Sequence, residues 1–290
     1  MDPVLSLSQQ ELLSLKHQVS LALKEDLSAI DANLDITAQL IDSQNHSEAT
    51  IITRESMTVC GVAWVNEVFA QLDGSITIDW LVSDGQVVEA NSVLCRLSGS
   101  SRSLLTGERT ALNFLQTLSA TATVAAFYTQ KLAGSNTRLL DTRKTLPGLR
   151  LAQKYAVRCG GGTNHRIGLY DAYLIKENHI AACGGIRQAV DRARQLNPGK
   201  PVEVEVENLD EFGQALQAQA DIVMLDNFSL ADINQAVTQN QQSSRPAQLE
   251  VSGNITDDRL HQLKDTGVDF ISSGALTKHI TAIDLSMRIS

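Results

Sequence analysis

The stretch that decides the fold is Val202–Leu225, which has the sequence VEVEVENLDEFGQALQAQADIVML. It predicts a strand at Val202–Val206, a helix at Leu209–Gln219 and a second strand at Ile222–Leu225. Runs of β-branched and other apolar residues favour strands, whereas the apolar spacing between these two runs is helical. A strand, a helix and a second strand in this order form the repeating unit of a parallel sheet.

The same alternation continues on both sides of this stretch, from Gly107 onward. Further β-like runs are Thr137–Leu140, Ala172–Ile175, Gln248–Val251 and Phe270–Ile271, and further helical stretches include Gly185–Leu196 and Leu230–Gln239. Parallel strands that are joined by helices can close, or nearly close, into a β/α barrel. We therefore expect an α/β barrel in this part of the chain.

The residues before Gly107 have a different sequence pattern, in which β-rich runs are mixed with helical stretches. The predicted strands are Ala49–Thr53, Ile76–Val82 and Ser92–Leu97, and the predicted helices are Ser8–Lys24 and the residues around Ala63–Leu72. The first helix is amphipathic, since its leucines and valine recur at helical spacing. This half is expected to form a small sheet with helices packed against it.

Composition narrows the class of protein. The 290 residues suffice for one large domain or two smaller ones. The net charge of −9 argues against a nucleic-acid-binding protein, because such proteins usually present a basic surface.

The N-terminus does not resemble a signal peptide. The charge-free run Thr110–Gln130 is long enough to cross a membrane, but its many Thr, Ser, Asn and Gln residues favour a buried helix. We expect a cytoplasmic protein with no membrane partner.

The four cysteines are Cys60, Cys95, Cys159 and Cys183. They form no C-x-x-C pair and no ladder with histidines, so the sequence predicts no structural zinc site. Their wide spacing suggests no disulfide framework either. Reduced thiols in a reducing compartment are the simplest interpretation.

Polar residues follow almost every predicted strand of the barrel, at the point where the strand ends. They are Asp141–Lys144, Lys176–His179, Asp226 and Asn227, Ser252–Asn254, and Ser272–Gly274. Active sites of β/α barrels are built just past the carboxyl ends of the strands. The pattern therefore predicts an enzyme whose active site lies at this end of the barrel.

Cations are concentrated in one part of an acidic chain. They are Arg109, Arg143, Lys144, His165, Arg166 and Lys176. Converging cations repel one another without an anion, and arginine matches a carboxylate or phosphate with paired hydrogen bonds. A small ligand with several negative charges is therefore expected. By contrast, Arg150, Lys154 and Arg158 recur at helical spacing, and we expect them to form an exposed stripe of like charge.

Two carboxylates and two glycine-containing turns complete the candidate residues. Glu205 lies in the alternating run that begins at Val202, where the glutamates would point into a barrel; an edge strand with solvated glutamates is the alternative. Asp226 follows the next strand. Glu203 and Glu207 could equally support the site or be solvated. The turns Ser252-Gly253-Asn254 and Ser273-Gly274-Ala275 end the last two strands, where barrels often bind phosphate.

Seven motifs occur in an order that is specific to one family. They are residues 107–113 (GERTALN), 141–145 (DTRKT), 161–166 (GGTNHR), 174–179 (LIKENH), 203–207 (EVEVE), 224–227 (MLDN) and 250–254 (EVSGN). Together they resemble the quinolinate phosphoribosyltransferases, and the match runs from about residue 20 to the C-terminus. The resemblance implies transfer of a phosphoribosyl group from phosphoribosyl pyrophosphate to quinolinate, with release of pyrophosphate and CO2. The product would be nicotinate mononucleotide, for NAD biosynthesis.

The resemblance also implies an architecture. We expect an N-terminal α/β sandwich domain over residues 1–112, to which a tail at about 277–290 returns. Residues 113–276 would form an incomplete, open α/β barrel of the TIM type. In a homodimer of such chains, the N-terminal domain of one subunit would cover the barrel mouth of the other, and Arg109 would reach the partner's site.

Roles for the candidate residues follow from the same resemblance. Arg109, Arg143, His165, Arg166 and Lys176 would surround the quinolinate carboxylates and nearby phosphates, with Thr142 as a hydroxyl donor. Lys144 would neutralise pyrophosphate. Glu205 and Asp226 would hold ribose hydroxyls, directly or through Mg²⁺ and its waters, and with Lys144 they are the expected catalytic residues. Ser252, Gly253, Asn254, Ser273, Gly274 and Ala275 would cradle the 5′-phosphate.

Three other functions remain open at this point. Lys176 at a strand end could form an imine, as in a Schiff-base aldolase. A related pyrophosphorylase, such as a nicotinate phosphoribosyltransferase or a relative associated with molybdenum transport, would need fewer arginines for its base. A non-catalytic binding protein on the same scaffold would bind the ligand without turnover.

Overall fold

The computed structural model of the chain describes residues 5–289 and divides into two compact units. Unit 1 contains the residues up to Phe127, Thr145–Gly161 and the residues from Leu276 on. Unit 2 contains Tyr128–Lys144 and Gly162–Ala275. The boundary expected at residue 112 falls inside a long helix, α3 (Ser101–Lys131), which begins in unit 1 and ends in unit 2.

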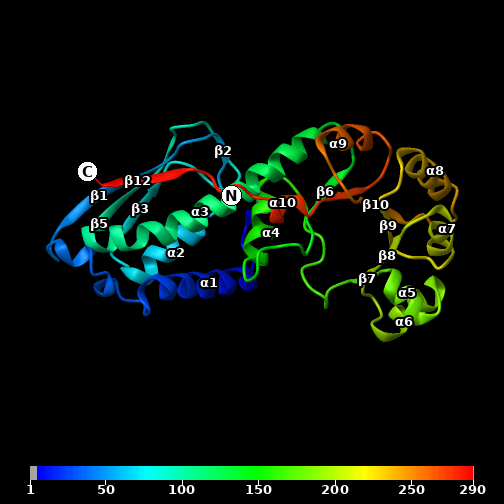
Figure 1. Cartoon of the computed structure of the whole chain (residues 1–290), viewed down its shortest axis with the longest axis horizontal. Coiled ribbons are helices and arrows are strands. Elements are labelled where there is room, and N and C mark those ends of the chain that lie inside the picture. Colours follow the sequence, from blue (N-terminus) through cyan, green and yellow to red (C-terminus); the bar gives the residue numbers. More distant parts are fainter. Residues whose placement is uncertain (1–4, 290) are drawn as a thin grey trace. The chain divides into compact units, whose positions relative to one another are not determined.

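Unit 1 is built on an antiparallel sheet with the strand order β12-β1-β5-β3. The strands are β1 (His46–Thr53), β3 (Thr77–Trp80), β5 (Val93–Ser100) and β12 (Leu285–Ile289). The strand β12, drawn in red, runs beside β1 (Figure 1), and Ile51 of β1 is opposite Met287 in this pairing. A short second sheet pairs β2 (Met57–Thr58) with β4 (Val87–Val88).

The helices of unit 1 are α1 (Gln9–Leu27), α2 (Val62–Leu72), most of α3 and α4 (Arg150–Cys159), and two short 3₁₀ turns, η2 (Ala32–Leu34) and η3 (Ala38–Leu40), accompany them. Figure 1 shows α1, α2 and α3 on one side of the sheet. Ser8 begins α1 with a reciprocal capping box to Glu11, which satisfies backbone donors at the helix start. The predicted helices and strands of this half are confirmed, with Trp64 and Phe69 buried in the shared core.

The prediction of an exposed stripe on α4 was wrong. Lys154 is only 1% exposed, and Arg158 forms an ion pair with Glu11 of α1 at 2.9 Å. The reason is that α4 packs into the core of unit 1 through Ala152, Tyr155 and Ala156. Lys154 and Arg158 lie on this helix, so their side chains are largely withdrawn from solvent together with it.

Unit 2 is built on a six-stranded sheet with the order β6-β11-β10-β9-β8-β7, in which every pair is parallel. The strands are β6 (Arg138–Leu140), β7 (Tyr173–Ile175), β8 (Val202–Val206), β9 (Ile222–Asp226), β10 (Gln248–Ser252) and β11 (Phe270–Ser272). All six predicted strands of the barrel are confirmed. Because β8 lies between β7 and β9, the alternative of an edge strand at Val202–Val206 is excluded.

The barrel is open between β6 and β7, which are the two edges of the sheet. The chain between these strands carries α4, and α4 belongs to the core of unit 1. The other connections carry α5 (Glu177–Cys183), α6 (Ile186–Leu196), α7 (Leu209–Gln217), α8 (Leu230–Gln241) and α9 (Asp257–Leu263), and α10 (Ala275–Lys278) follows β11. The expected combination of an α/β sandwich and an incomplete α/β barrel is therefore confirmed.

The charge-free run Thr110–Gln130 lies within α3, as a helix with buried polar side chains such as Ser119 and Thr121. Within residues 5–289, no helix combines the length and the apolar character that crossing a membrane requires. The cytoplasmic location stays a prediction.

Candidate active site

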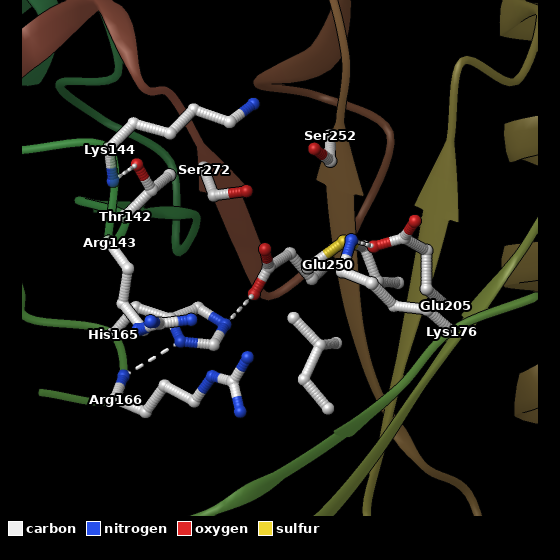
Figure 2. Close-up of a pocket in the computed structure, with 12 residues that line it drawn as sticks. Thr142, Arg143, Lys144, His165, Arg166, Lys176, Glu205, Glu250, Ser252 and Ser272 are labelled. Atoms are coloured by element: carbon white, nitrogen blue, oxygen red, sulfur yellow. Dashed lines mark hydrogen bonds and ion pairs between the residues drawn. The ribbon is translucent and has the colours of Figure 1, made fainter. Parts of the chain in front are cut away.

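A pocket of about 260 Å³ lies at the carboxyl ends of the parallel strands of unit 2. It is lined by Thr142, Arg143, Lys144, His165, Arg166, Leu174, Lys176, Glu205, Met224, Glu250, Ser252 and Ser272. Figure 2 shows Arg143, His165 and Arg166 on one side, the Lys176–Glu205 pair on the other, and Glu250 between them. Eight of the predicted site residues thus lie around one cavity.

Two arginines of this pocket are not neutralised by carboxylates that contact them. The Nε of Arg143 is buried without a hydrogen-bond partner among the described residues. Arg166 donates from Nη1 to the carbonyl oxygen of Ala172 at 3.2 Å. Burial lowers the pKa of Arg166, and the charge of Arg143 lowers it further. Two like charges held close to each other without a carboxylate in contact are typical of a site that binds an anion.

The loop that carries His165 and Arg166 is held in place by the buried Asp141. The Nδ2 of Asn164 donates to one carboxylate oxygen at 2.6 Å, and the backbone N–H of His165 donates to the other at 2.9 Å. Asp141 directly follows β6 and is fully buried. The aspartate thereby fixes the loop beside Arg143, although it does not line the pocket itself.

His165 contacts two buried glutamates beneath the pocket. Its Nε2 lies 3.0 Å from Glu203 and 3.4 Å from Glu250, which are 2% and 0% exposed. Burial alone lowers the pKa of His165, but the two carboxylates outweigh it and raise this pKa to about 10. Burial and the charge of Glu250 raise the pKa of Glu203 to about 7. His165 and Glu203 therefore hold protons at a higher pH than isolated side chains of their types would.

A backbone contact limits where those protons lie. The N–H of Arg166 donates to Nδ1 of His165 at 2.7 Å, so Nδ1 must be unprotonated while this bond exists. The ring hydrogen is then on Nε2 and faces Glu203. The bond opposes the imidazolium that the carboxylates favour. Both imidazole nitrogens are used within the protein, which leaves His165 as part of the pocket wall.

Glu205 and Lys176 form an ion pair across the ends of β8 and β7. Asp226 ends β9 and is opposite Ser252 of β10, and its Oδ2 accepts a hydrogen bond from Asn227 at 2.8 Å. Mg²⁺ that accompanies phosphates is typically held by one or two carboxylates, with phosphate oxygens and waters completing its shell. The oxygens of Glu205 and Asp226, on adjacent strands, fit that requirement.

The first predicted phosphate turn only partly lines the pocket. Ser252 does, whereas Gly253 and Asn254 line a neighbouring hollow of about 400 Å³. Gly253 has φ +95°, and a Cβ there would lie 2.1 Å from Oδ1 of Asn227. Only glycine fits this position, because both the backbone conformation and the close contact exclude a side chain.

The remaining predicted residues lie outside the pocket lining. Ser273 is buried and its Oγ accepts a hydrogen bond from the N–H of Ala275 at 3.3 Å. A Cβ on Gly274 would lie 2.8 Å from Cδ of Lys144, so this glycine leaves room for the lysine. Arg109 is exposed on α3 and belongs to unit 1, whereas the pocket is built from unit 2.

Sequence reasoning missed several residues of the pocket. Glu250, Ser272, Leu174 and Met224 line it, and Glu203 supports it through His165. Glu250 could have been found by the argument that was applied to Glu205, since both are charged residues inside predicted parallel strands. The register places them in one row, because each is opposite Met224 of β9.

Comparison with family models identifies both parts of the chain. Residues 35–119 match the quinolinate phosphoribosyl transferase N-terminal domain, and residues 121–288 match the C-terminal domain. A probable carboxylating nicotinate-nucleotide pyrophosphorylase from Synechocystis is 41% identical over 256 residues, which cover 88% of this chain and 87% of that protein. The carboxylating nicotinate-nucleotide pyrophosphorylase of Mycobacterium leprae is 36% identical to this chain. The alignment covers 98% of this chain and 100% of that protein.

Solved structures agree with these relatives. The nicotinate-nucleotide pyrophosphorylase from Francisella tularensis has 52% sequence identity and a TM-score of 0.92, with both chains covered completely. NadC from Streptococcus pyogenes has 36% identity and a TM-score of 0.91, with 98% of each chain covered. The sequence motifs, the open parallel barrel and the cationic pocket fit the same assignment. This chain belongs to the quinolinate phosphoribosyl transferase family.

Proposed function

We propose that the pocket of unit 2 binds quinolinate and phosphoribosyl pyrophosphate and joins them. The ring nitrogen of quinolinate takes the phosphoribosyl group, pyrophosphate and CO2 leave, and nicotinate mononucleotide is formed. Membership of the family supports this reaction. In the structure, the observation that carries the proposal is Arg143, whose buried Nε faces no partner within the described residues beside a second arginine.

The cationic side of the pocket suits a planar dicarboxylate. Arg143 and Arg166 can each present a fork of N–H donors to a carboxylate, and such paired hydrogen bonds are stronger than neutral ones. Thr142 adds a hydroxyl at the same edge. A dicarboxylate would relieve the repulsion between both arginines, whereas a monocarboxylate would relieve it only in part. This difference favours quinolinate over nicotinate as the base.

The opposite side of the pocket suits the sugar and its phosphates. Glu205 and Asp226 would accept hydrogen bonds from ribose hydroxyls and would also hold Mg²⁺ through their oxygens. When bound, Mg²⁺ would supply positive charge that stabilises the departing pyrophosphate. Lys144, whose side chain is exposed at the pocket edge, would contribute charge to the same group. The backbone from Ser252 to Asn254 and from Ser273 to Ala275 would receive the 5′-phosphate.

The chain's own contribution to the chemistry is mostly positioning and charge. Loss of pyrophosphate leaves an oxocarbenium-like ribose carbon, and nearby carboxylates such as Glu205 offset its positive charge. The arginines hold the quinolinate ring so that its nitrogen is in line for attack. Once the nitrogen carries the ribosyl group, the cationic ring stabilises the carbanion that loss of CO2 creates. No covalent nucleophile is needed, which removes the need for an imine at Lys176.

The site is further proposed to be completed in a homodimer. Arg109 is an exposed arginine in one of the seven family motifs, yet it belongs to unit 1. In the dimer it would enter the pocket of the partner subunit and add a third arginine for the carboxylates. Arg109→Ala is expected to reduce quinolinate binding while leaving the dimer intact, which analytical ultracentrifugation can check.

A direct assay tests the reaction. The purified chain is incubated with quinolinate, phosphoribosyl pyrophosphate and Mg²⁺, and nicotinate mononucleotide and CO2 are followed, with nicotinate as a parallel substrate. We expect product from quinolinate and little from nicotinate. Product from nicotinate alone would assign the pocket to a different base. Absence of both products from an intact, ligand-binding dimer would favour the non-catalytic alternative.

A further inference from the structure

A second cluster of chemically reactive groups lies in unit 1, outside the pocket. Cys60, Asp84 and Cys159 place two Sγ atoms and a carboxylate oxygen within 4.8 Å of one another. The cysteines are buried, with exposures of 0% and 7%. Cys60 directly precedes the N-cap of α2, Asp84 lies between β3 and β4, and Cys159 is the last residue of α4. Three separate segments therefore converge on this cluster.

The carboxylate of the cluster is held in a fixed orientation. Its Oδ1 accepts hydrogen bonds from the backbone N–H groups of Gly61 at 2.9 Å and Val62 at 3.2 Å. Tyr155 donates to Oδ2 at 2.8 Å. Asp84 thus caps α2 and still has a lone pair on Oδ2. Such outer hydrogen bonds are what orient the carboxylate ligands of metal sites.

Neither of the two thiols forms a disulfide, and Cys60 interacts with both Cys159 and Asp84. Burial raises the pKa of the Cys60 thiol well above its usual value, and the neighbouring Cys159 and Asp84 raise it further. Burial likewise raises the pKa of Asp84, although its hydrogen bonds oppose this. Two thiols and a carboxylate are thus packed together in the interior, with their ligand atoms within 4.8 Å of one another. Ligand atoms at this spacing can contact one cation at the same time.

We propose that Cys60, Cys159 and Asp84 bind one divalent ion of the class that prefers sulfur, with Zn²⁺ as the occupant. Two thiol protons leave to solvent, and two sulfur–metal bonds and one carboxylate–metal bond form. Thiolate sulfur selects such ions over Mg²⁺ and Ca²⁺, which prefer oxygen. Water or the Tyr155 hydroxyl completes the four ligands that zinc usually has. The resulting charge of −1 is offset by the guanidinium of Arg158, which lies over the Tyr155 ring at 5.3 Å.

The other cluster of potential ligands, His165 with Glu203 and Glu250, does not support a metal ion. A metal bound to Nε2 would require the proton of the neutral ring to sit on Nδ1. Nδ1, however, accepts the N–H of Arg166 at 2.7 Å and cannot carry a proton at the same time. This cluster therefore holds protons, and of the two only the cysteine cluster is open to a metal.

A disulfide between Cys60 and Cys159 is the alternative, and burial of both thiols disfavours it. Thiol oxidation proceeds through the thiolate, and a buried thiol with a raised pKa reacts slowly. Metal binding, by contrast, gains from the third acidic group, since Asp84 supplies a ligand. By linking the start of α2, the loop before β4 and the end of α4, the ion would stabilise unit 1.

The test is titration of the metal-free full-length chain with Co²⁺, followed by displacement with Zn²⁺. We expect one Co²⁺ per chain, with a thiolate charge-transfer band that Zn²⁺ abolishes. Cys60→Ser and Cys159→Ser should each weaken binding by at least about 100-fold, which corresponds to loss of a direct ligand rather than of an outer contact. Cys95→Ser and Cys183→Ser are the matched controls and should bind as the unmodified chain does.

A measurement on the unmodified chain covers the case in which the cysteine variants fail to fold. Native mass spectrometry should show one Zn²⁺ bound with the loss of two protons, and Zn²⁺ should raise the thermal unfolding midpoint. Absence of bound metal after incubation with excess Zn²⁺ would overturn the proposal. A Co²⁺ band that disappears only in Cys183→Ser, or an isolated Cys60–Cys159 disulfide peptide from a chain that binds no metal, would overturn it as well.

Discussion

Arg158 in unit 1 and Arg143 in unit 2 both have a buried Nε without a hydrogen-bond partner among the described residues, yet their other surroundings differ. Arg158 donates from Nη1 to Glu11 at 2.9 Å and lies over the ring of Tyr155. Arg143 has no such pairing within residues 5–289, and its charge lowers the pKa of a second arginine, Arg166. One arginine is satisfied by the fold, whereas the other is held ready for a partner that the chain does not supply.

Arg158 is an example of a charged group that stabilises the protein, and Arg143 is an example of one that is proposed to bind its substrate. An unpaired buried charge lowers stability, so it is retained only where it serves another purpose. Substitution of each arginine or its partner should therefore affect different measurements. Changes around Arg158 should alter unfolding, and changes at Arg143 should alter ligand binding.

The largest effect is expected for Arg143→Ala. A quinolinate carboxylate that loses its arginine should bind more weakly by about 3–5 kcal/mol, while the free energy of unfolding changes little. Isothermal calorimetry with quinolinate and urea unfolding measure the two quantities. Arg138→Ala is the matched control, because Arg138 begins the same strand and stacks on Phe270 at 4.6 Å, away from the pocket lining. Near-normal quinolinate affinity in Arg143→Ala would remove this residue from the site.

Glu11→Gln should have the opposite profile. Loss of the charged hydrogen bond to Arg158 should destabilise the chain by about 1.5–3 kcal/mol at neutral pH, with quinolinate affinity unchanged. Asp191→Asn, which breaks an exposed pair with Arg187 at 3.9 Å, is the control and should cost less than about 0.5 kcal/mol. If both variants unfold at the same urea concentration, the pairing of Arg158 contributes no stability.

The same pair predicts a pH dependence. Burial raises the pKa of Glu11, but the hydrogen bonds from Arg158 and Ser8 outweigh it, so this pKa lies below its ordinary value of 4.5. A carboxyl whose pKa is lowered in the folded state contributes stability that is complete above the unfolded value. This contribution is lost as the pH falls through the folded value. The stability difference between the unmodified chain and Glu11→Gln should therefore shrink below about pH 4.5, as measured by unfolding in acidic buffers.

Substitution of Gly253 tests the turn of unit 2 that is proposed to bind the 5′-phosphate. Gly253→Ala places a Cβ at φ +95° and 2.1 Å from Oδ1 of Asn227, so the turn must shift. We expect a cost of about 1–3 kcal/mol in stability and weaker binding of phosphoribosyl pyrophosphate. Quinolinate affinity should be preserved, since Arg143 and Arg166 lie across the pocket. Gly199→Ala is the control, because Gly199 also has a positive φ but has open space around it. Its cost in stability measures the backbone strain alone, without a steric contact.

The smallest effect is expected at the start of α1. Ser8→Ala removes the hydroxyl that accepts the Glu11 N–H at 3.3 Å and should cost about 1 kcal/mol of stability. Thermal unfolding measures the change, and Ser14→Ala on the same helix serves as a comparison. A shift that matches Ser14→Ala would mean that the cap contributes nothing beyond helix propensity.

Much of the fold could be predicted because its strands carry strong local patterns. The valine and glutamate alternation of β8 predicted the strand and glutamates that point into the barrel. Whether Glu203 is solvated was left open, and it is 2% exposed. The opening of the barrel was expected from the family resemblance and not from the local patterns, because it depends on α4 joining the core of unit 1. The burial of Lys154 was missed for the same reason, since helical spacing describes one helix and not what packs around it.

Site residues that follow strands could be predicted from the sequence. Contacts between side chains on different strands could not. Arg143 could be placed from its position in the segment that follows β6, and Lys176 from its position directly after β7. The contact of His165 with Glu203 and Glu250 depends on sheet order and register, which one sequence does not encode locally. The convergence of Cys60 with Cys159 is likewise invisible in the spacing of the cysteines.

The most direct test of the central claim is a crystal structure of the chain with quinolinate bound. The account predicts a quinolinate carboxylate within hydrogen-bond distance of Nε of Arg143, with Arg166 on the same ligand and His165 still bonded to Glu203. Quinolinate bound elsewhere, with Nε of Arg143 still lacking a partner, would contradict the claim that this arginine is held unpaired for the substrate.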